Sequence, residues 1–290
     1  MRNRWGPKVI SIVTISMNQG RFLPAAVDSG LAQRDVDLEY FIVDAGSTDG
    51  SREYLAALTD PRVKLLLEPD QGPADGLNKG VRCTSGSVVG CLNADDIYLA
   101  GTLRGVDDVF RSTPHVDVVY GDGWIIDRDD RVVRHFESTP WELRQYLYGG
   151  VNVLQQSTFF RRSVFERTAG FNTLNVTCWD GELLVDLALA GARFRHVRVD
   201  WSAFRLHRDG ISGSGRLEAR YQQDRSRFVA RTLGRGPSPI DPVLDLSARG
   251  TKLLRSPGYA LRRLTSRPGA ESRIERGPEG YVVRSDLART

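Results

Sequence analysis

Four short apolar runs lie in the first hundred residues, at positions 8–15, 38–44, 63–67 and 88–92. Each is nearly continuous in Val, Ile, Leu or Phe, which is typical of a strand buried on both faces of a parallel sheet. Segments with apolar residues at helical spacing, such as 22–32, lie between them. The pattern predicts an α/β fold in which a mostly parallel sheet carries helices on both faces.

Acidic residues follow these runs. Asp44 ends the second run, Asp70 and Asp75 follow the third, and Asp95 and Asp96 follow the fourth. In an open α/β sheet, ligands bind in the crevice outside the carboxyl ends of the strands, so we expect these carboxylates to meet at one edge. Each acid taken alone can also be read as a helix cap or a turn residue.

Asp95 and Asp96 are adjacent in the sequence. Two neighbouring carboxylates stay ionised together only beside a cation or strong hydrogen-bond donors. Carboxylate oxygens are the ligands that Mg²⁺ and Mn²⁺ prefer, and such an ion keeps coordination positions for substrate phosphates. The pair therefore predicts a divalent-metal site, with a helix cap or a solvated turn as the alternative.

The second half of the chain is predicted to contain strands at 116–120 and 132–136. A helix is expected to begin at Asp180 and to end at Gly191. A carboxylate at a helix N-terminus is stabilised as the anion by the helix dipole and the free N–H groups. Asp180 is thus either an ordinary cap or a carboxylate that takes part in chemistry.

The pattern weakens after residue 215. There we predict an arginine-rich helix at 217–233, a Gly/Pro linker at 234–242, an interfacial helix at 251–267 and a mobile end from 268.

The 290 residues, 40% of them hydrophobic, are enough for one large core. Cys83, Cys91 and Cys178 are too widely spaced for a disulfide framework or a zinc site, which favours a reducing cytosol. No apolar run approaches the roughly 18 residues that cross a bilayer. We therefore expect a cytoplasmic protein whose membrane contact is at most peripheral.

The net charge is unevenly distributed. Residues 1–215 carry 24 basic and 28 acidic side chains, whereas residues 216–290 carry 16 and 8, so the body is at −4 and the tail at +8. Such a tail is expected either to contact an anionic neighbour, such as the inner face of a membrane, or simply to be soluble. Nucleic acid is not expected as a partner, because the basic residues are not interleaved with aromatic ones.

Known phosphate-binding loops are missing from the sequence. There is no G-x-x-x-x-G-K-[ST] loop, and no G-x-G-x-x-G follows the first run. A metal ion must then meet the phosphate charge. The remaining acids suit hydrogen bonds to ribose hydroxyls and to a base N–H, which indicates a bound nucleotide.

Four motifs in order carry a family resemblance: IVDAGSTDGS at 42–51, EPDQG at 68–72, NKG at 78–80 and LNADD at 92–96. They resemble the family 2 glycosyltransferases with a GT-A fold. The resemblance covers about residues 8–215 and implies a nucleotide-sugar-binding half (8–100) and an acceptor-binding half (101–215). Residues 216–290 are then a basic C-terminal extension.

The resemblance also implies that residues 155–160 form a strand near the donor sugar. It implies roles for individual residues as well. Asp180 is expected to be the catalytic base, with Glu182 as the runner-up. Asp96, as part of a D-x-D-type element, and His207, from an Arg-x-His segment, are the expected ligands of Mn²⁺ or Mg²⁺. The expected contacts to the nucleotide-sugar are Thr14, Ser16, Asp44, Asp70, Asp75, Lys79, Asn93 and Asp95. Asn93 replaces the first acid of the usual D-x-D-D pattern, and Trp179 replaces an acid that often precedes the base.

These expectations predict a metal-dependent, inverting glycosyltransferase that moves a sugar from a UDP- or dTDP-linked donor to a hydroxyl of a glycan, lipid-linked glycan or glycolipid. The sequence lacks the Q-x-x-R-W signature of processive relatives, so one sugar is expected per encounter. The alternatives are a sugar nucleotidyltransferase, which would need a Gly- and Arg-rich loop after the first strand, and a non-catalytic protein that binds nucleotide-sugars.

Overall fold

The computed structural model describes residues 9–255 and 272–285. Their helices and strands, in chain order, are β1 (Ile10–Ser16), α1 (Leu23–Leu31), β2 (Leu38–Asp44), α2 (Ser51–Ala56), β3 (Val63–Leu66), α3 (Pro73–Cys83), β4 (Val88–Cys91), β5 (Ile97–Tyr98), α4 (Thr102–Ser112), β6 (Val118–Ile126), β7 (Val132–Phe136), α5 (Leu143–Leu147), the 3₁₀ turn η1 (Gln155–Ser157), β8 (Thr158–Arg161), α6 (Arg162–Phe165), α7 (Trp179–Leu189), β9 (Phe194–Arg205), α8 (Glu218–Leu233), α9 (Asp241–Arg255), β10 (Arg273–Gly277) and β11 (Gly280–Arg284).

A nine-stranded sheet runs through the molecule in the order β3-β2-β1-β4-β8-β6-β9-β5, with β7 paired to β6. The first four strands are parallel, as the apolar runs predict. Strand β8 is antiparallel to both of its neighbours, and β5 and β7 are also antiparallel to the strands beside them. Because Ser16 pairs with Asp44 at the last rung of β1 and β2, these strands end together at one edge.

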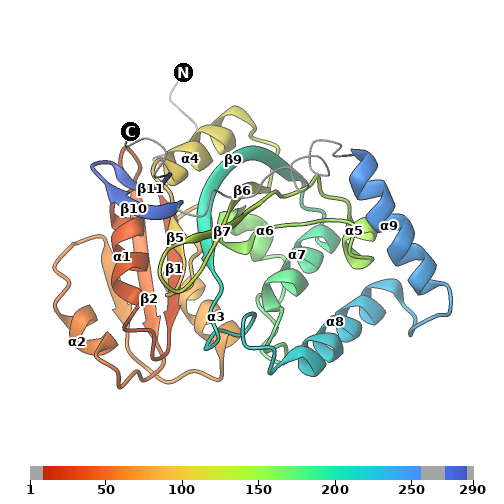
Figure 1. Ribbon diagram of the computed structural model, residues 1–290, viewed down its shortest axis with the longest axis horizontal. Coiled ribbons are helices and arrows are strands. Elements are labelled where there is room, and N and C mark those ends of the chain that lie inside the picture. The colour runs from red at the N-terminus through yellow and green to blue at the C-terminus, as the bar shows by residue number, and fades with distance from the viewer. Residues whose placement is uncertain (1–8, 256–271, 286–290) are drawn as a thin grey trace.

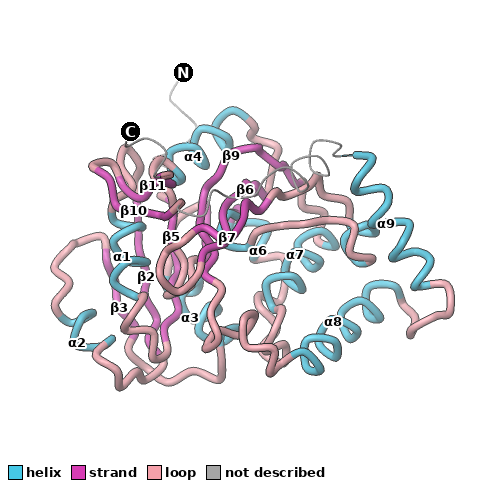
Figure 2. Tube along the Cα trace, viewed as in Figure 1, coloured by secondary structure: helices cyan, strands magenta, loops and turns pink. Residues whose placement is uncertain are grey.

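Side-chain alternation along the strands explains the layers. Ile12 of β1 and Tyr40 of β2 belong to a buried cluster with helices α1, α2 and α4, whereas Val13 and Phe41 face α3, α6 and α7. The sheet is therefore covered on both sides, as Figures 1 and 2 show. This confirms the predicted α/β architecture.

The C-terminal stretch is more ordered than the sequence suggests. Helix α8 matches its prediction, but α9 begins at Asp241, inside the expected linker. Strands β10 and β11 form a hairpin that the sequence analysis missed, having expected a mobile end from residue 268. Residues 256–271, which include most of the expected interfacial helix, lie outside the described residues.

The hairpin packs on the first half of the chain, beside α1 (Figure 1). The Ala100 N–H donates to the Tyr281 carbonyl at 2.8 Å, and the Ile274 N–H donates to the Asp130 carbonyl at 2.9 Å. Arg276 pairs with Asp28 of α1. Ile274 is buried in an apolar cluster with Ile97 and other residues, so the end of the chain completes part of the core.

No helix within residues 9–255 and 272–285 is both long enough and apolar enough to span a bilayer.

A pH-dependent ion pair joins two neighbouring parts of the sheet. His135 of β7 lies 2.6 Å from Asp200 of β9, with its Nε2 on Oδ1. Burial lowers the pKa of His135, but the hydrogen bond to Asp200 and the charges of Asp200, Asp122 and Glu137 outweigh burial and leave the pKa raised. The stabilisation is fully present below the ordinary His pKa of about 6.5. It is lost as the pH rises through the higher folded-state pKa.

We expect His135→Gln to lower the unfolding midpoint by about 1–3 °C at pH 6 and by less at pH 8.5, since such exposed pairs contribute up to about 1 kcal/mol. Thermal denaturation at both pH values measures this. The exposed His115→Gln serves as the control. A difference from wild type that grows with pH would contradict the assignment.

Candidate active site

A cavity of about 570 Å³ opens at the sheet edge where β1 and β4 end. This volume is in the usual range for small-molecule sites. Both halves of the chain line it, including Ile15 at the end of β1, Phe136 of β7 and Trp179 of α7. Its charged lining residues are Asp70, Asp95, Arg134, Asp180, Arg205 and Asp209.

Five of the residues predicted from the sequence line this cavity: Ser16, Asp70, Asn93, Asp95 and Asp180. Ser16 ends β1, and its buried hydroxyl has no hydrogen-bond partner among the described residues. An unsatisfied buried hydroxyl costs free energy, so this atom marks a place where a ligand can bind.

Asp70 keeps part of its hydrogen-bonding capacity free. Its Oδ1 accepts from the Gly72 N–H at 2.9 Å. Burial raises the pKa of Asp70, and the neighbouring Asp75 and Asp44 raise it further, against the Gly72 N–H and Lys79. Such a carboxylate gains stabilisation from any donor that a ligand brings, which suits a contact to a nucleoside hydroxyl or base N–H.

Thr14 and Asp44 are fully buried beside the cavity but do not line it. The Thr14 hydroxyl lies 2.9 Å from the Tyr40 hydroxyl in the layer of α1. Asp44 accepts from the N–H groups of Gly46 and Ser47 and from the Arg52 guanidinium. Burial raises the pKa of Asp44, but these donors outweigh burial and lower it. In this structure Asp44 organises the turn after β2.

Asp75 and Lys79 also lie outside the lining. Asp75 accepts from the Gln71 N–H at 3.0 Å and pairs with Lys79 at 3.3 Å. Lys79 donates to the Pro69 carbonyl at 2.6 Å. Together they brace the loop that carries Asp70.

The two acids after β4 point in different directions. Asp95 lines the cavity, and its Oδ2 lies 2.9 Å from Nε2 of His207. Asp96 is fully buried, and its oxygens accept from Asn93, Gln156 and the Arg205 N–H. These donors reach both oxygens, and Asp96 does not line the cavity. Asp96 instead fixes Asn93, whose side chain faces the cavity.

Only one of the two ring nitrogens of His207 makes a hydrogen bond among the described residues. A carboxylate only accepts hydrogen bonds, so Nε2 carries the proton in the contact with Asp95. Nδ1 is buried and has no hydrogen-bond partner among the described residues. The nearest carboxylate, that of Asp209, lies 3.9 Å away. The ring packs 4.9 Å from that of Phe22.

Oxygen and imidazole nitrogen donors of this kind fit Mn²⁺ or Mg²⁺. Within residues 9–255 and 272–285, however, no group of three or more His, Cys, Asp or Glu side chains is arranged to hold a metal ion. Asp95 lines the cavity, and His207 lies behind it, in contact with Asp95 through Nε2. Both could hold one ion only if that contact opened, and the ion would need further ligands from water or substrate phosphates.

Asp180 lies in the first turn of α7 and faces the large cavity. It also borders a second, apolar cavity of about 40 Å³. Burial raises the pKa of Asp180, against the N–H groups of Gly181 and of Asp180 itself. A carboxylate with a raised pKa that faces a cavity is a suitable general base.

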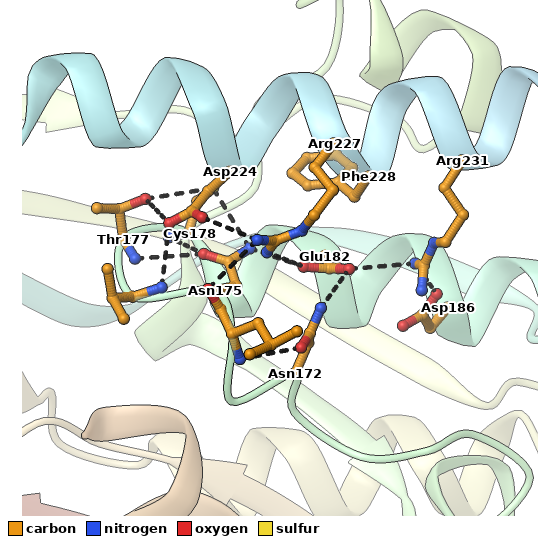
Figure 3. A network of polar contacts seen from close by, with 12 residues as sticks. Asn172, Asn175, Thr177, Cys178, Glu182, Asp186, Asp224, Arg227, Phe228 and Arg231 are labelled. Carbon is orange, nitrogen blue, oxygen red and sulfur yellow. Dashed lines mark hydrogen bonds and ion pairs between the residues drawn. The ribbon is translucent and has the colours of Figure 1, made fainter. Parts of the chain in front are cut away.

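Glu182, the runner-up base, points away from both cavities. It is 1% exposed, and its oxygens accept from Asn172 at 3.0 Å and Asn175 at 2.8 Å. Arg227 and Arg231 of α8 pair with it, as Figure 3 shows. The structure therefore favours Asp180 over Glu182.

Sequence reasoning missed several lining residues, notably Arg134 and Thr177. Arg134 and Phe136 alternate along β7, so a period of two could have shown that they share a face. Gln156, expected in a strand near the donor sugar, lies instead in the 3₁₀ turn η1 before β8, and it donates to Asp96 at 2.6 Å. No local pattern reveals such a contact, because the two residues are 60 positions apart.

The fold and cavity together define an α/β protein with a small-molecule site at one edge of its sheet. Comparison with known proteins shows its family. The profile of glycosyl transferase family 2 matches residues 11–167, more than half of the chain. The chain therefore belongs to glycosyl transferase family 2 and is a glycosyltransferase.

Two relatives illustrate the similarity. The chain is 26% identical over 282 residues to an uncharacterized glycosyltransferase of Nostoc sp., covering 88% of this chain and 85% of the relative. It is 29% identical over 209 residues to a PGL/p-HBAD biosynthesis glycosyltransferase of Mycobacterium tuberculosis, covering 66% of this chain and 75% of the relative.

Solved structures confirm the GT-A fold. The mannosyltransferase PcManGT from Pyrobaculum calidifontis, in complex with GDP-Man and Mn²⁺, superposes with a TM-score of 0.60 at 19% identity, covering 91% of this chain and 77% of that one. TarS residues 1–349 from S. aureus gives 0.60 at 14% identity, covering 96% of both chains.

Proposed function

We propose that this glycosyltransferase is metal-dependent and inverting, and that Asp180 is its general base. The observation that carries the proposal is that Asp180 faces the same cavity as Asp70, Asp95 and the unsatisfied Ser16 hydroxyl. A base on the acceptor side and a nucleotide site on the strand edge are the two parts that such a reaction needs.

In the reaction, an acceptor hydroxyl oxygen forms a bond to the anomeric carbon as the bond from that carbon to the diphosphate oxygen breaks. Asp180 takes the hydroxyl proton, and the nucleoside diphosphate leaves with the electron pair. A single displacement of this kind inverts the anomeric configuration. Burial of Glu182 leaves Asp180 as the carboxylate of α7 that can meet the acceptor.

Asp95 and His207 would hold the metal ion in place of the predicted pair of Asp96 and His207. When bound, Mn²⁺ or Mg²⁺ would offset negative charge on the leaving diphosphate. Asp70, Asn93 and Ser16 contact the nucleotide-sugar from the cavity wall. Asp44, Asp75 and Lys79 keep their assignment to the nucleotide half, acting through the loops they brace, and Thr14 acts through the end of β1.

The donor is a UDP- or dTDP-linked sugar. Solved TarS complexes with UDP and UDP-GlcNAc support a uridine nucleotide, and the PcManGT complex supports a donor bound with Mn²⁺. The acceptor is a hydroxyl of a glycan, lipid-linked glycan or glycolipid, and the lack of a Q-x-x-R-W segment favours transfer of one sugar per encounter.

The protein works in the cytoplasm and contacts the inner face of the membrane peripherally through its basic C-terminal region. Exposed Val243 and Leu246 on α9, together with the positive charge of residues 216–290, support this.

A nucleotide screen tests the donor proposal. UDP or dTDP at about 100 times its dissociation constant, with Mn²⁺, should stabilise the fold by about 2.7 kcal/mol and raise the unfolding midpoint by roughly 5–10 °C. GDP and ADP should do less, and a chelator should remove the effect. Equal shifts with and without Mn²⁺ would contradict metal dependence, whereas pyrophosphate release from a nucleoside triphosphate would favour the nucleotidyltransferase.

A further inference from the structure

Helix α8 forms hydrogen bonds with the loop that precedes α7. Asp224 of α8 is fully buried, and its Oδ2 accepts from the Val176 N–H at 3.0 Å and from the Thr177 hydroxyl at 2.8 Å. Arg220 and Arg227 of α8 both donate to the Leu174 carbonyl. One helix thus holds three residues of the loop formed by residues 172–178. Figure 3 shows Asp224 of α8 beside Thr177 of this loop.

Glu182 ties the same loop to α7 from the other side. Its two oxygens accept from Asn172 and Asn175. Arg227 and Arg231 of α8 lie 3.5 and 3.4 Å from these oxygens. A buried carboxylate is tolerated only where donors and cations compensate it, and here all four come from the loop and from α8.

Asn175 links the loop to the start of α7. It is fully buried, and its Oδ1 accepts from the N–H groups of Thr177 and Cys178 at 3.2 and 2.9 Å. The side chain of Cys178 makes no capping hydrogen bond, so Asn175 orders the entry to α7 by holding the N–H groups of the two residues just before the helix. Asp180 follows two residues later.

The loop and the first turn of α7 present Thr177, Trp179 and Asp180 to the large cavity. Apolar contacts reinforce the polar ones, since Phe228 of α8 shares a buried cluster with Cys178 and Val185. The direction in which Asp180 points is therefore set by contacts that reach across to α8.

We propose that Asp224 and Glu182 are positioning residues, through which α8 holds the 172–178 loop and aims Asp180 at the acceptor hydroxyl. The inference rests on the proposed function, because it takes Asp180 as the base. Helix α8 lies beyond the family match at 11–167 and within the expected extension. The inference makes this helix a part of the catalytic unit.

The test compares Asp224→Asn with wild type in the full-length protein, in an assay of sugar transfer with measured kcat, KM for donor and pH profile. The substitution puts an amide where the Val176 N–H and Thr177 hydroxyl need an acceptor. We expect kcat to fall about 10- to 100-fold, as for loss of an outer-shell partner. The donor KM should stay within about twofold, and the acidic limb of the kcat–pH profile should move because the surroundings of Asp180 change.

Glu182→Gln is the second variant and decides the matter if Asp224→Asn does not fold. Its kcat should fall in the same way, while its KM for the donor stays nearly unchanged. The matched control is Glu218→Gln, an exposed acid of α8 whose hydrogen bond is to Gln222 within the same helix. The control should keep wild-type kcat.

Wild-type kcat and an unmoved pH profile in a folded Asp224→Asn or Glu182→Gln protein would overturn the inference. So would an equal loss of donor binding, which would indicate a general structural effect. Asp180→Asn is run alongside: if that variant keeps transfer activity, the proposed function has failed, and this result is distinct from failure of the positioning role alone.

Discussion

Asp180→Asn should abolish sugar transfer and at the same time stabilise the protein. Without the carboxylate, no group of α7 takes the acceptor proton, and loss of a general base costs about 10²- to 10⁴-fold in rate. Donor binding should be nearly unchanged, since the nucleotide residues lie on the strand edge. Transfer kinetics and donor calorimetry on the same protein measure the two effects.

The stability change follows from the sign of the pKa shift. Burial raises the folded-state pKa of Asp180, so the proton that favours the fold is present below the ordinary Asp pKa of about 3.9. The wild type loses this stabilisation as the pH rises through the raised pKa, whereas the amide has nothing to lose. Asp180→Asn should therefore melt higher than wild type at pH 7, with a smaller difference near pH 4.

The exposed Glu166→Gln, with no role in the cavity, is the control and should match wild type in both assays. A variant that loses donor binding and transfer equally would reject Asp180 as the base.

Asp95→Ala should produce the second large effect, the loss of metal-dependent activity. Removing this carboxylate takes away a proposed ligand and the partner of His207, so we expect at least about a 100-fold fall in transfer. The Mn²⁺-dependent rise in unfolding midpoint with nucleotide should disappear as well. Titration of activity against Mn²⁺, and the thermal shift, are the measurements.

Asp108→Asn is a suitable comparison, because Asp108 is exposed on α4 and pairs with Arg104 of the same helix. A wild-type response of the Asp95→Ala protein to Mn²⁺ would show that Asp95 is not a metal ligand.

The nucleotide half could be predicted because its signals are local. Buried parallel strands are continuous apolar runs, and the acids after them are adjacent to the strands in sequence. Asp70 and Asp95 were therefore expected at the cavity, and they line it. Ser16, which the family resemblance supplied, lines it as well. The family resemblance indicated a catalytic role for Asp180. From its position at the start of a helix alone, Asp180 could equally have been an ordinary cap.

What the sequence could not show depends on contacts between distant residues. Asp95 and Asp96 look equivalent in the sequence. In the structure, Asp96 is buried and accepts hydrogen bonds from Gln156 and the Arg205 N–H, both of which lie far along the chain. Glu182 and Asp180 likewise differ because Asn172 and Asn175 of the preceding loop donate to Glu182. Two arginines of α8 also pair with it. The hairpin β10–β11 was missed because its packing on Ala100 and Asp130 has no local signature.

The returning hairpin has a practical consequence for choosing recombinant fragments. A fragment cut to the family match would end at residue 167, before Asp180 and His207, and one cut at residue 215 would still lack α8 and the hairpin. Both cuts would leave the apolar neighbours of Ile274 exposed to water, an arrangement that favours aggregation.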